Sequence, residues 1–117
     1  MSIQRQLTNE RMSQIVVHNG TVYLAGQVGD DMAAGIEQQT RETLHSIERL
    51  LALAGTDKSR ILSVTIYLKD IDAHFAGMNS VWDQWLPKGL APARATVEAR
   101  LCEPEILVEL SVVAALP

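Results

Sequence analysis

The spacing of hydrophobic residues changes along the chain, and each change predicts the start of a new element. Two short β-rich runs, Ile15–His18 and Thr21–Ala25, flank the dipeptide Asn19-Gly20. Because Asn-Gly fits the tight turns that join antiparallel strands, this stretch predicts a β-hairpin. A further short strand is predicted at Ile3–Leu7, ahead of the hairpin.

A loop and then a helix are predicted after the hairpin. The segment Gly26–Ala34 is rich in glycine and aspartate, which predicts an irregular connection. From Ala34 to Ala54 apolar or small side chains recur every three or four residues, which predicts a helix, and Gly55 stands where a glycine commonly ends one. The positions on this face are Ile36, Thr40, Leu44, Ile47, Leu51 and Ala54.

A strand and a second helix follow. Either Asp70 or Asp72 can cap the helix, which Pro87 ends. Its apolar stripe is predicted to lie in the core and consists of Ile71, Phe75, Met78, Trp82 and Trp85. Strict alternation over Ile61–Lys69 predicts the strand. One face of the strand then carries Leu62, Val64, Ile66 and Leu68, and the other carries Ile61, Ser63, Thr65 and Tyr67.

The last two strands are predicted at Arg94–Leu101 and Ile106–Ala114, joined through Cys102 and Pro104. The element order is therefore β-β-α-β-α-β-β, which favours a two-layer α+β fold with two helices on one face of a mixed sheet. The other face is expected to be semi-polar, which suits a wet interface or cavity between subunits of a homo-oligomer. Its predicted members are Ile61, Ser63, Thr65, Tyr67, Arg94, Thr96, Glu98, Arg100, Leu107, Glu109, Ser111 and Val113.

The last two strands also carry the strongest candidate for chemistry. If they form a hairpin that turns near Cys102, residues whose numbers sum to about 203 face each other, and Glu109 lies opposite Arg94. A guanidinium binds a carboxylate through two parallel hydrogen bonds, and a neighbouring glutamate can activate water. The pair therefore suits hydrolysis of a small anion. The alternative is a plain cross-strand ion pair, with Glu98 and Arg100 forming another.

Composition narrows the function classes. The chain has 117 residues, of which 47% are hydrophobic and 21% charged, and this predicts one globular domain spanning residues 1–117. The sequence shows neither a membrane helix nor a signal peptide, and Cys102 is the single cysteine, which favours a cytoplasmic protein without membrane contact. The net charge of −4 does not favour nucleic acid as a partner. His18, His45 and His74 share no metal-ligand spacing, so no metal site is predicted.

Several stretches resemble the RidA/YjgF family, in the family's own order. The end of the chain, Ala91–Leu101 followed by Val108–Ala114, resembles the family's Pro-x-Arg signature and the glutamate after it. Asn19–Val28 resembles the strand that ends in Ser-Gly-Gln, Val64–Asp70 resembles the central strand, and Phe75–Trp82 resembles the second helix. The similarity covers roughly residues 13–115 and is closest to the YoaB-like branch.

The resemblance implies a chorismate-mutase-like α+β fold assembled as a homotrimer, with sites in the clefts between subunits. It also implies hydrolysis of reactive 2-imino acids and their enamine tautomers, such as 2-iminopropanoate and 2-aminoacrylate, to 2-oxo acids and ammonia. Such a deaminase, of the 2-iminobutanoate/2-iminopropanoate type, limits metabolite damage by small carboxylate-bearing intermediates. No metal or organic cofactor is expected.

The resemblance also assigns roles by position. Arg94 corresponds to the arginine that binds the substrate carboxylate, and Glu109 to the glutamate that positions the attacking water. Thr96 stands where the family often has a cysteine whose backbone contacts the substrate, and Gly26 matches the glycine that lines the cleft. Asn79 matches a recurring asparagine, for which a structural hydrogen bond is as plausible as a catalytic one.

Two positions depart from the family pattern. Ala25 replaces the serine before Gly-Gln, and Met12 stands where the family has a tyrosine, so two hydroxyls that help to order substrate or water are lost. Tyr23 or Ser13 could supply a replacement. The alternative to an enzyme is therefore a non-catalytic trimer that binds a small carboxylate, or regulates, through the same cleft. Trp85 is a further candidate for the edge of that cleft.

Overall fold

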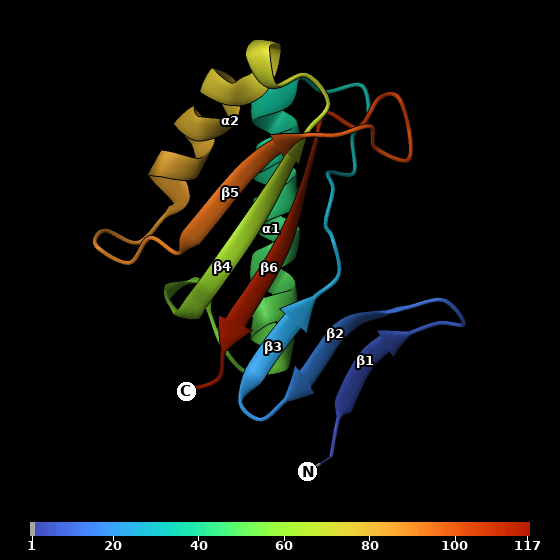
Figure 1. The fold of residues 1–117 in the computed structure, drawn as a ribbon, viewed down its shortest axis with the longest axis vertical. Helices are drawn as coiled ribbons and strands as arrows, with labels where there is room; N and C mark the ends of the chain where they lie inside the picture. The colour runs from blue at the N-terminus through green and yellow to red at the C-terminus, as the bar shows by residue number, and fades with distance from the viewer. Residues whose placement is uncertain (1) are drawn as a thin grey trace.

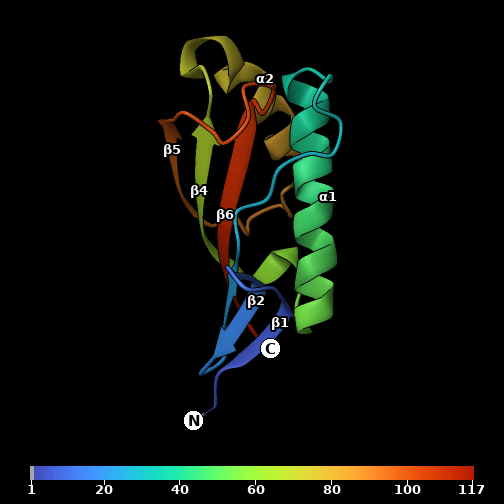
Figure 2. The ribbon, with the colours of Figure 1, turned by 90° about the vertical axis from the view of Figure 1, so that its right-hand side faces the viewer.

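The computed structural model describes residues 2–117, which form a six-stranded mixed sheet with two α-helices on one face (Figure 1). From the side, the sheet and the helices form two layers (Figure 2). The strand order is β1-β2-β3-β6-β4-β5, and the predicted α+β class is confirmed. The elements are β1 (Gln4–Thr8), β2 (Ser13–His18), β3 (Thr21–Leu24), α1 (Ile36–Ala54), a 3-10 turn η1 (Lys58–Arg60), β4 (Ile61–Leu68), α2 (Ile71–Trp85), β5 (Ala93–Glu98) and β6 (Val108–Ala115).

The Asn19-Gly20 turn joins β2 to β3, as the sequence predicts. Both residues have positive φ, 51° at Asn19 and 75° at Gly20, which is the combination that a type I′ turn requires. β1 pairs antiparallel with β2, which confirms the predicted first strand. These three strands make the antiparallel end of the sheet (Figure 1).

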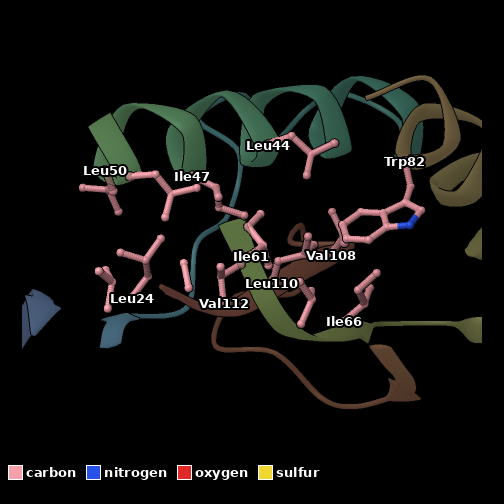
Figure 3. Close-up of a cluster of buried hydrophobic side chains, with 14 of the residues drawn as sticks. Leu24, Leu44, Ile47, Leu50, Ile61, Ile66, Trp82, Val108, Leu110 and Val112 are labelled. Carbon is pink, nitrogen blue, oxygen red and sulfur yellow. The ribbon is translucent and has the colours of Figure 1, made fainter. Parts of the chain in front are cut away.

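α1 packs its apolar face against the middle of the sheet. Gly55 ends the helix with a φ of 91°, and its N–H bonds back to the carbonyl of Ala52, as expected of a C-terminal glycine. Burying a large aliphatic side chain stabilises a fold by about 1.5–3 kcal/mol, so this layer contributes much of the stability. The buried core (Figure 3) includes Leu24, Leu44, Ile47, Leu50, Ile66, Trp82, Val108, Leu110 and Val112.

A bulge at the start of β4 changes which residues face the core. The register between β4 and β6 shifts between Ile61 and Ser63, so Ile61 is buried and Leu62 is 51% exposed. The prediction of strict alternation is therefore wrong at Ile61 and Leu62, because a bulge adds one residue and inverts the parity on one side of it. From Ser63 to Leu68 the predicted alternation holds.

The predicted hairpin between the last two strands does not form. β4 lies between them and pairs parallel with β5 and antiparallel with β6. The reason is α2, because a strand–helix–strand crossover returns the chain parallel to the strand it left. The connection 99–107 then crosses from one side of β4 to the other before β6 begins (Figure 1). The predicted register that set Glu109 opposite Arg94 is therefore wrong.

α2 covers the part of the sheet next to β5 (Figure 1). The carboxylate of Asp70 accepts a backbone N–H of the first turn, which confirms the predicted cap. The helix buries Met78 and Trp82, but Phe75 is 42% exposed, so its predicted core position is wrong. Phe75 differs because β5 is the edge strand, and the ring faces Arg94 of that strand rather than another apolar layer.

Candidate active site

Arg94 projects from β5 toward the helix layer. It lies beside Val64 in the parallel register of β4 and β5, and Val64 is buried in the core, so both side chains point to the helix side. Nη1 of Arg94 donates a hydrogen bond of 2.7 Å to Oδ1 of Asn79 on α2. The guanidinium carbon lies 5.9 Å from the ring centre of Phe75 and 5.6 Å from that of Trp82, within the range of cation–π contacts. α2 therefore fixes the direction of the guanidinium.

The guanidinium of Arg94 is available to an anionic ligand. Arg94 is exposed, and no carboxylate pairs with it among residues 2–117. A guanidinium has five N–H donors, and Asn79 accepts from one of its nitrogens. The remaining donors suit the two parallel hydrogen bonds that an arginine makes to a carboxylate.

Thr96 and Glu98 lie on the same side of β5 as Arg94. The Thr96 hydroxyl is buried and has no hydrogen-bond partner in the described part of the chain. Oε1 of Glu98 accepts the backbone N–H of Ile71 at 3.1 Å, at the N-terminus of α2, where a negative charge is favoured. The alternative expectation of a Glu98–Arg100 ion pair is therefore wrong, because Glu98 binds the helix instead.

Glu109 projects from β6 to the opposite face of the sheet, which carries no helix. It pairs with Tyr67 of β4, whose neighbours in the strand are buried on the helix side. Gly26 approaches so closely that a Cβ built there would lie 2.1 Å from Oε2 of Glu109. Both residues line a cavity of about 340 Å³. The rest of its lining consists of Tyr67, Ala99, Arg100, Leu101, Cys102 and Ser111.

Within one chain, Arg94 and Glu109 therefore lie on opposite faces of the sheet, with β4 between their strands. The prediction that both emerge on one semi-polar face holds for Glu109 and is wrong for Arg94, Thr96 and Glu98. The error has a single cause. Because β5 runs parallel to β4, its even-numbered residues align with the buried residues of β4 and share their orientation.

Gln27 fixes the segment that carries Gly26. Its side chain is buried, and Nε2 donates at 2.8 Å to a side chain of β2 while Oε1 accepts from the Ser46 hydroxyl of α1 at 2.8 Å. Its backbone exchanges two hydrogen bonds with Leu110, the residue after Glu109. Gln27 thus ties Gly26 both to the helix and to the strand of Glu109, in a buried network whose donors and acceptors are satisfied.

Sequence reasoning places Arg100 incorrectly and finds no role for Gln27. Arg100 is predicted on the same side as Arg94, whereas it lines the cavity of Glu109. β5 ends at Glu98, and after the N–H of Ala99 bonds to β4 the chain leaves the strand, so alternation no longer determines where Arg100 lies. For Gln27 the only signal is its place directly after Gly26 at the end of a strand, which does not reveal the buried network.

The other candidates lie outside the cavity of Glu109. Met12 is 42% exposed just before β2, and Ala25 is half-buried beside Gly26. Trp85 lines a separate cavity of about 300 Å³ between the two helices, so it is not at the edge of the Glu109 cavity. Neither proposed source of a replacement hydroxyl reaches that cavity: the Ser13 hydroxyl bonds to β1, and Tyr23 pairs with β6 farther along.

Three further properties concern residues 2–117. These residues contain no group of three or more His, Cys, Asp or Glu side chains placed to hold a metal ion. None of their helices combines the length and the apolar character needed to cross a membrane. Cys102 is a free, exposed thiol at the rim of the Glu109 cavity.

The loop after Gly26 is attached to α1 through Glu42, which makes its stability dependent on pH. The carboxylate accepts backbone N–H groups of Asp31 and Asp30 and the amide of Gln38, and these bonds lower the pKa of Glu42. Because the folded-state pKa lies below the unfolded value, the stabilisation is complete above the unfolded pKa and is lost as the pH falls through the folded one. We expect Glu42→Gln to reduce the loss of stability between neutral and acid pH, measured by urea unfolding.

Glu37→Gln is the matched control for that measurement, because it removes the same charge from the same helix and because Glu37 pairs with Arg41 of that helix. An identical acid sensitivity in Glu42→Gln and the wild type would contradict the assigned role of Glu42.

Comparisons with known proteins identify relatives over nearly the whole chain. Residues 3–116 match the family model described as endoribonuclease L-PSP. RutC family protein YoaB of Escherichia coli is 43% identical over 115 residues, covering 98% of this chain and 99% of that protein. A RutC family protein of Haemophilus ducreyi is 42% identical over 114 residues, covering 97% of each.

Two solved structures superpose closely on this chain over nearly its whole length. A member of the YjgF protein family from Neisseria meningitidis superposes with a TM-score of 0.96 at 41% identity, covering 100% of this chain and 97% of that one. A protein from Pseudomonas aeruginosa superposes with a TM-score of 0.95 at 44% identity, covering 99% of this chain and 100% of that one. Because the family model and these relatives span almost the whole sequence, the chain belongs to the YjgF/RidA family, as its motifs predict.

Proposed function

We propose that this protein hydrolyses small 2-imino acids, and the enamines that tautomerise to them, to 2-oxo acids and ammonia. The observation that carries the proposal is the pair of functional groups at the family's motif positions. Arg94 offers an exposed guanidinium held by Asn79, and Glu109 offers a carboxylate over Gly26 in a polar cavity. The first group binds a substrate carboxylate and the second acts on water.

The proposed site is shared between subunits. Arg94 and Glu109 lie on opposite faces of one sheet, so a substrate that contacts both takes them from two copies of the chain. A closed ring of three subunits supplies three such clefts through one repeated interface. The face without helices suits the interface, because it exposes Tyr23 and Val97 beside half-buried polar side chains.

The reaction proceeds by addition and elimination. Glu109 accepts a proton from a water molecule as that water attacks the C=N carbon, and the protonated Glu109 passes this proton to the nitrogen, which gives a carbinolamine. The carbinolamine hydroxyl then gives its proton to Glu109, which passes it to the amine nitrogen as the C–N bond breaks, so that the C=O bond forms and ammonia leaves. The sum is imine plus water to 2-oxo acid plus ammonia, with Glu109 regenerated as the carboxylate.

The chain needs to supply only orientation and a base for this reaction. An imine is already electrophilic, so it needs little further activation. Holding it by its carboxylate lowers the barrier by several kcal/mol, which is less than the roughly 7–11 kcal/mol that ideal positioning can reach. General base catalysis by a positioned carboxylate adds a factor of about 10²–10⁴. Asn79 and α2 keep the carboxylate-binding group fixed during both steps.

A non-catalytic carboxylate-binding trimer is the second candidate. It is favoured by one observation: Ala25 and Met12 carry no hydroxyl, and neither Ser13 nor Tyr23 lines the Glu109 cavity. Binding of pyruvate that depends on Arg94, without any acceleration of imine hydrolysis, would support this candidate. Ribonuclease action, which the family model's description names, is not favoured by the net charge of −4.

Mixed trimers test both the reaction and the shared site. Arg94→Ala and Glu109→Gln chains, each assembled alone, are expected to be slower than the wild type by about 10²-fold or more. When the two are refolded together in equal amounts, about one quarter of the clefts receive an intact Arg94 from one subunit and an intact Glu109 from its neighbour. We expect that fraction of wild-type activity, measured as the disappearance of iminopropanoate generated in situ by an amino-acid oxidase.

The control mixes Arg94→Ala chains with chains that carry both substitutions. This mixture contains no intact Arg94 and is expected to stay inactive. If the first mixture also stays inactive although the wild type is active, Arg94 and Glu109 do not act together across subunits. If the wild type itself does not accelerate the reaction, the proposed activity is wrong.

A further inference from the structure

A second arginine lies in the cavity of Glu109. Arg100 follows the last hydrogen bond of β5, where the N–H of Ala99 bonds to the carbonyl of Leu68, and it lines the same cavity as Glu109. Among residues 2–117, Arg100 makes neither an ion pair nor a side-chain hydrogen bond, although Glu109 lines the same space. By contrast, Arg94 on the other face is already held by Asn79.

The remaining polar groups of the cavity suit an anion next to Arg100. Tyr67 and Ser111 bring hydroxyl groups, and Glu109 is the only acidic residue of the lining. A second cavity of about 350 Å³ adjoins the first and shares Arg100 with it. It adds Lys69, whose ammonium donates to a backbone carbonyl of the loop before β6, and Glu103.

We infer that the substrates of this protein include 2-imino acids with a second, distal carboxylate. The inference rests on the proposed function: Arg94 of one subunit binds the carboxylate next to the imine, and Glu109 of its neighbour acts on water. Arg100, in the cavity of that same Glu109, then binds the distal carboxylate through its planar pair of N–H donors. A cavity of about 340 Å³ leaves room for an acid of four or five carbons.

The charge of Arg100 favours a substrate with a distal carboxylate over a substrate whose side chain is neutral. A monocarboxylate brings no second carboxylate to Arg100, whereas a diacid forms a charge-assisted hydrogen bond there, which is stronger than a hydrogen bond between neutral groups. Such a difference corresponds to a preference of about 10- to 100-fold in kcat/KM. The reaction at the imine carbon is the same for both classes of substrate, so the preference arises from binding.

The test compares two imines generated in situ by amino-acid oxidases, iminosuccinate from aspartate and iminopropanoate from alanine. The wild type is expected to prefer iminosuccinate, and Arg100→Ala is expected to lower the ratio of the two kcat/KM values by about 10- to 100-fold. Arg100→Lys keeps a charge but loses the planar fork, so an intermediate ratio is expected. Arg49→Ala, on the exposed face of α1, is the matched control and is expected to keep the wild-type ratio.

Binding provides a readout that does not require turnover. Oxaloacetate is expected to raise the melting temperature of the wild type more than pyruvate does, and Arg100→Ala is expected to remove the difference. Equal responses to both acids would overturn the inference even if the protein hydrolyses iminopropanoate. Loss of the wild-type assembly in Arg100→Ala, measured by ultracentrifugation, would also overturn it, because Arg100 would then be an interface residue. If neither imine is hydrolysed, the proposed reaction fails and the assignment of substrates fails with it, whereas oxaloacetate binding that depends on Arg100 would still locate the distal carboxylate at Arg100.

Discussion

Replacing Glu109 by glutamine is expected to slow the hydrolysis of iminopropanoate by about 10²–10⁴-fold, because the amide keeps the shape of the carboxylate but cannot accept a proton from water. The loss should appear in kcat, since Arg94, which binds the substrate carboxylate, is on the other face of its own sheet and is unchanged. Pyruvate should therefore still raise the melting temperature of the variant. Steady-state kinetics and thermal unfolding with and without pyruvate measure both effects.

Glu105→Gln is the matched control for Glu109→Gln. Glu105 is exposed in the connection before β6, and its side chain does not line the cavity. The control is expected to retain the wild-type rate. A normal rate in Glu109→Gln would show that another group activates the water, whereas loss of pyruvate binding in that variant would show that Glu109 contributes to binding rather than to the chemical step.

A methyl group at Gly26 is expected to reduce the rate by about 10²-fold, the effect of displacing a catalytic group by roughly 1 Å. The Cβ of Gly26→Ala would lie 2.1 Å from Oε2 of Glu109, so that carboxylate must move. Because the displaced atoms are the end of a flexible side chain, the variant is expected to fold. Its urea unfolding midpoint should stay close to that of the wild type while its kcat falls.

Gly35→Ala provides a glycine control without a steric contact. No atom lies within 4 Å of a Cβ built at Gly35, which is also not in a left-handed conformation. The control is expected to keep the rate of the wild type, and its stability should fall by about 1 kcal/mol at most, because alanine is a poorer helix N-cap than glycine. An unchanged rate in Gly26→Ala would contradict the idea that the position of Glu109 limits catalysis.

Local signals were sufficient to predict most elements of this fold. The Asn19-Gly20 turn, the helix that ends at Gly55 and the cap at Asp70 each depend on residues close in sequence, and the structure confirms all three. The pairing of β5 depends instead on tertiary contacts. A hairpin with β6 satisfies the local pattern equally well, and only the packing of α2 against the sheet excludes it.

The site illustrates the same limit. The resemblance to the family selects Arg94, Glu109 and Gly26 by position, but side-chain direction follows from strand pairing, which the sequence did not reveal. Because β6 was predicted as the neighbour of β5 in place of β4, Arg94 was assigned to the wrong face of the sheet. The roles of Gln27 and Arg100 could not be predicted from the sequence for a related reason. A buried amide network and a side chain beyond the end of a strand have no periodic pattern in the sequence.

Within one chain a β-sheet separates Arg94 from Glu109, and this separation would make the activity depend on protein concentration. Under the proposed function, a newly made chain carries both groups and can use neither with the other. The activity per chain would then rise steeply with protein concentration near the dissociation constant of the assembly, and it would vanish on sufficient dilution. Abundance would control this protein more sharply than it controls an enzyme whose site lies within one subunit.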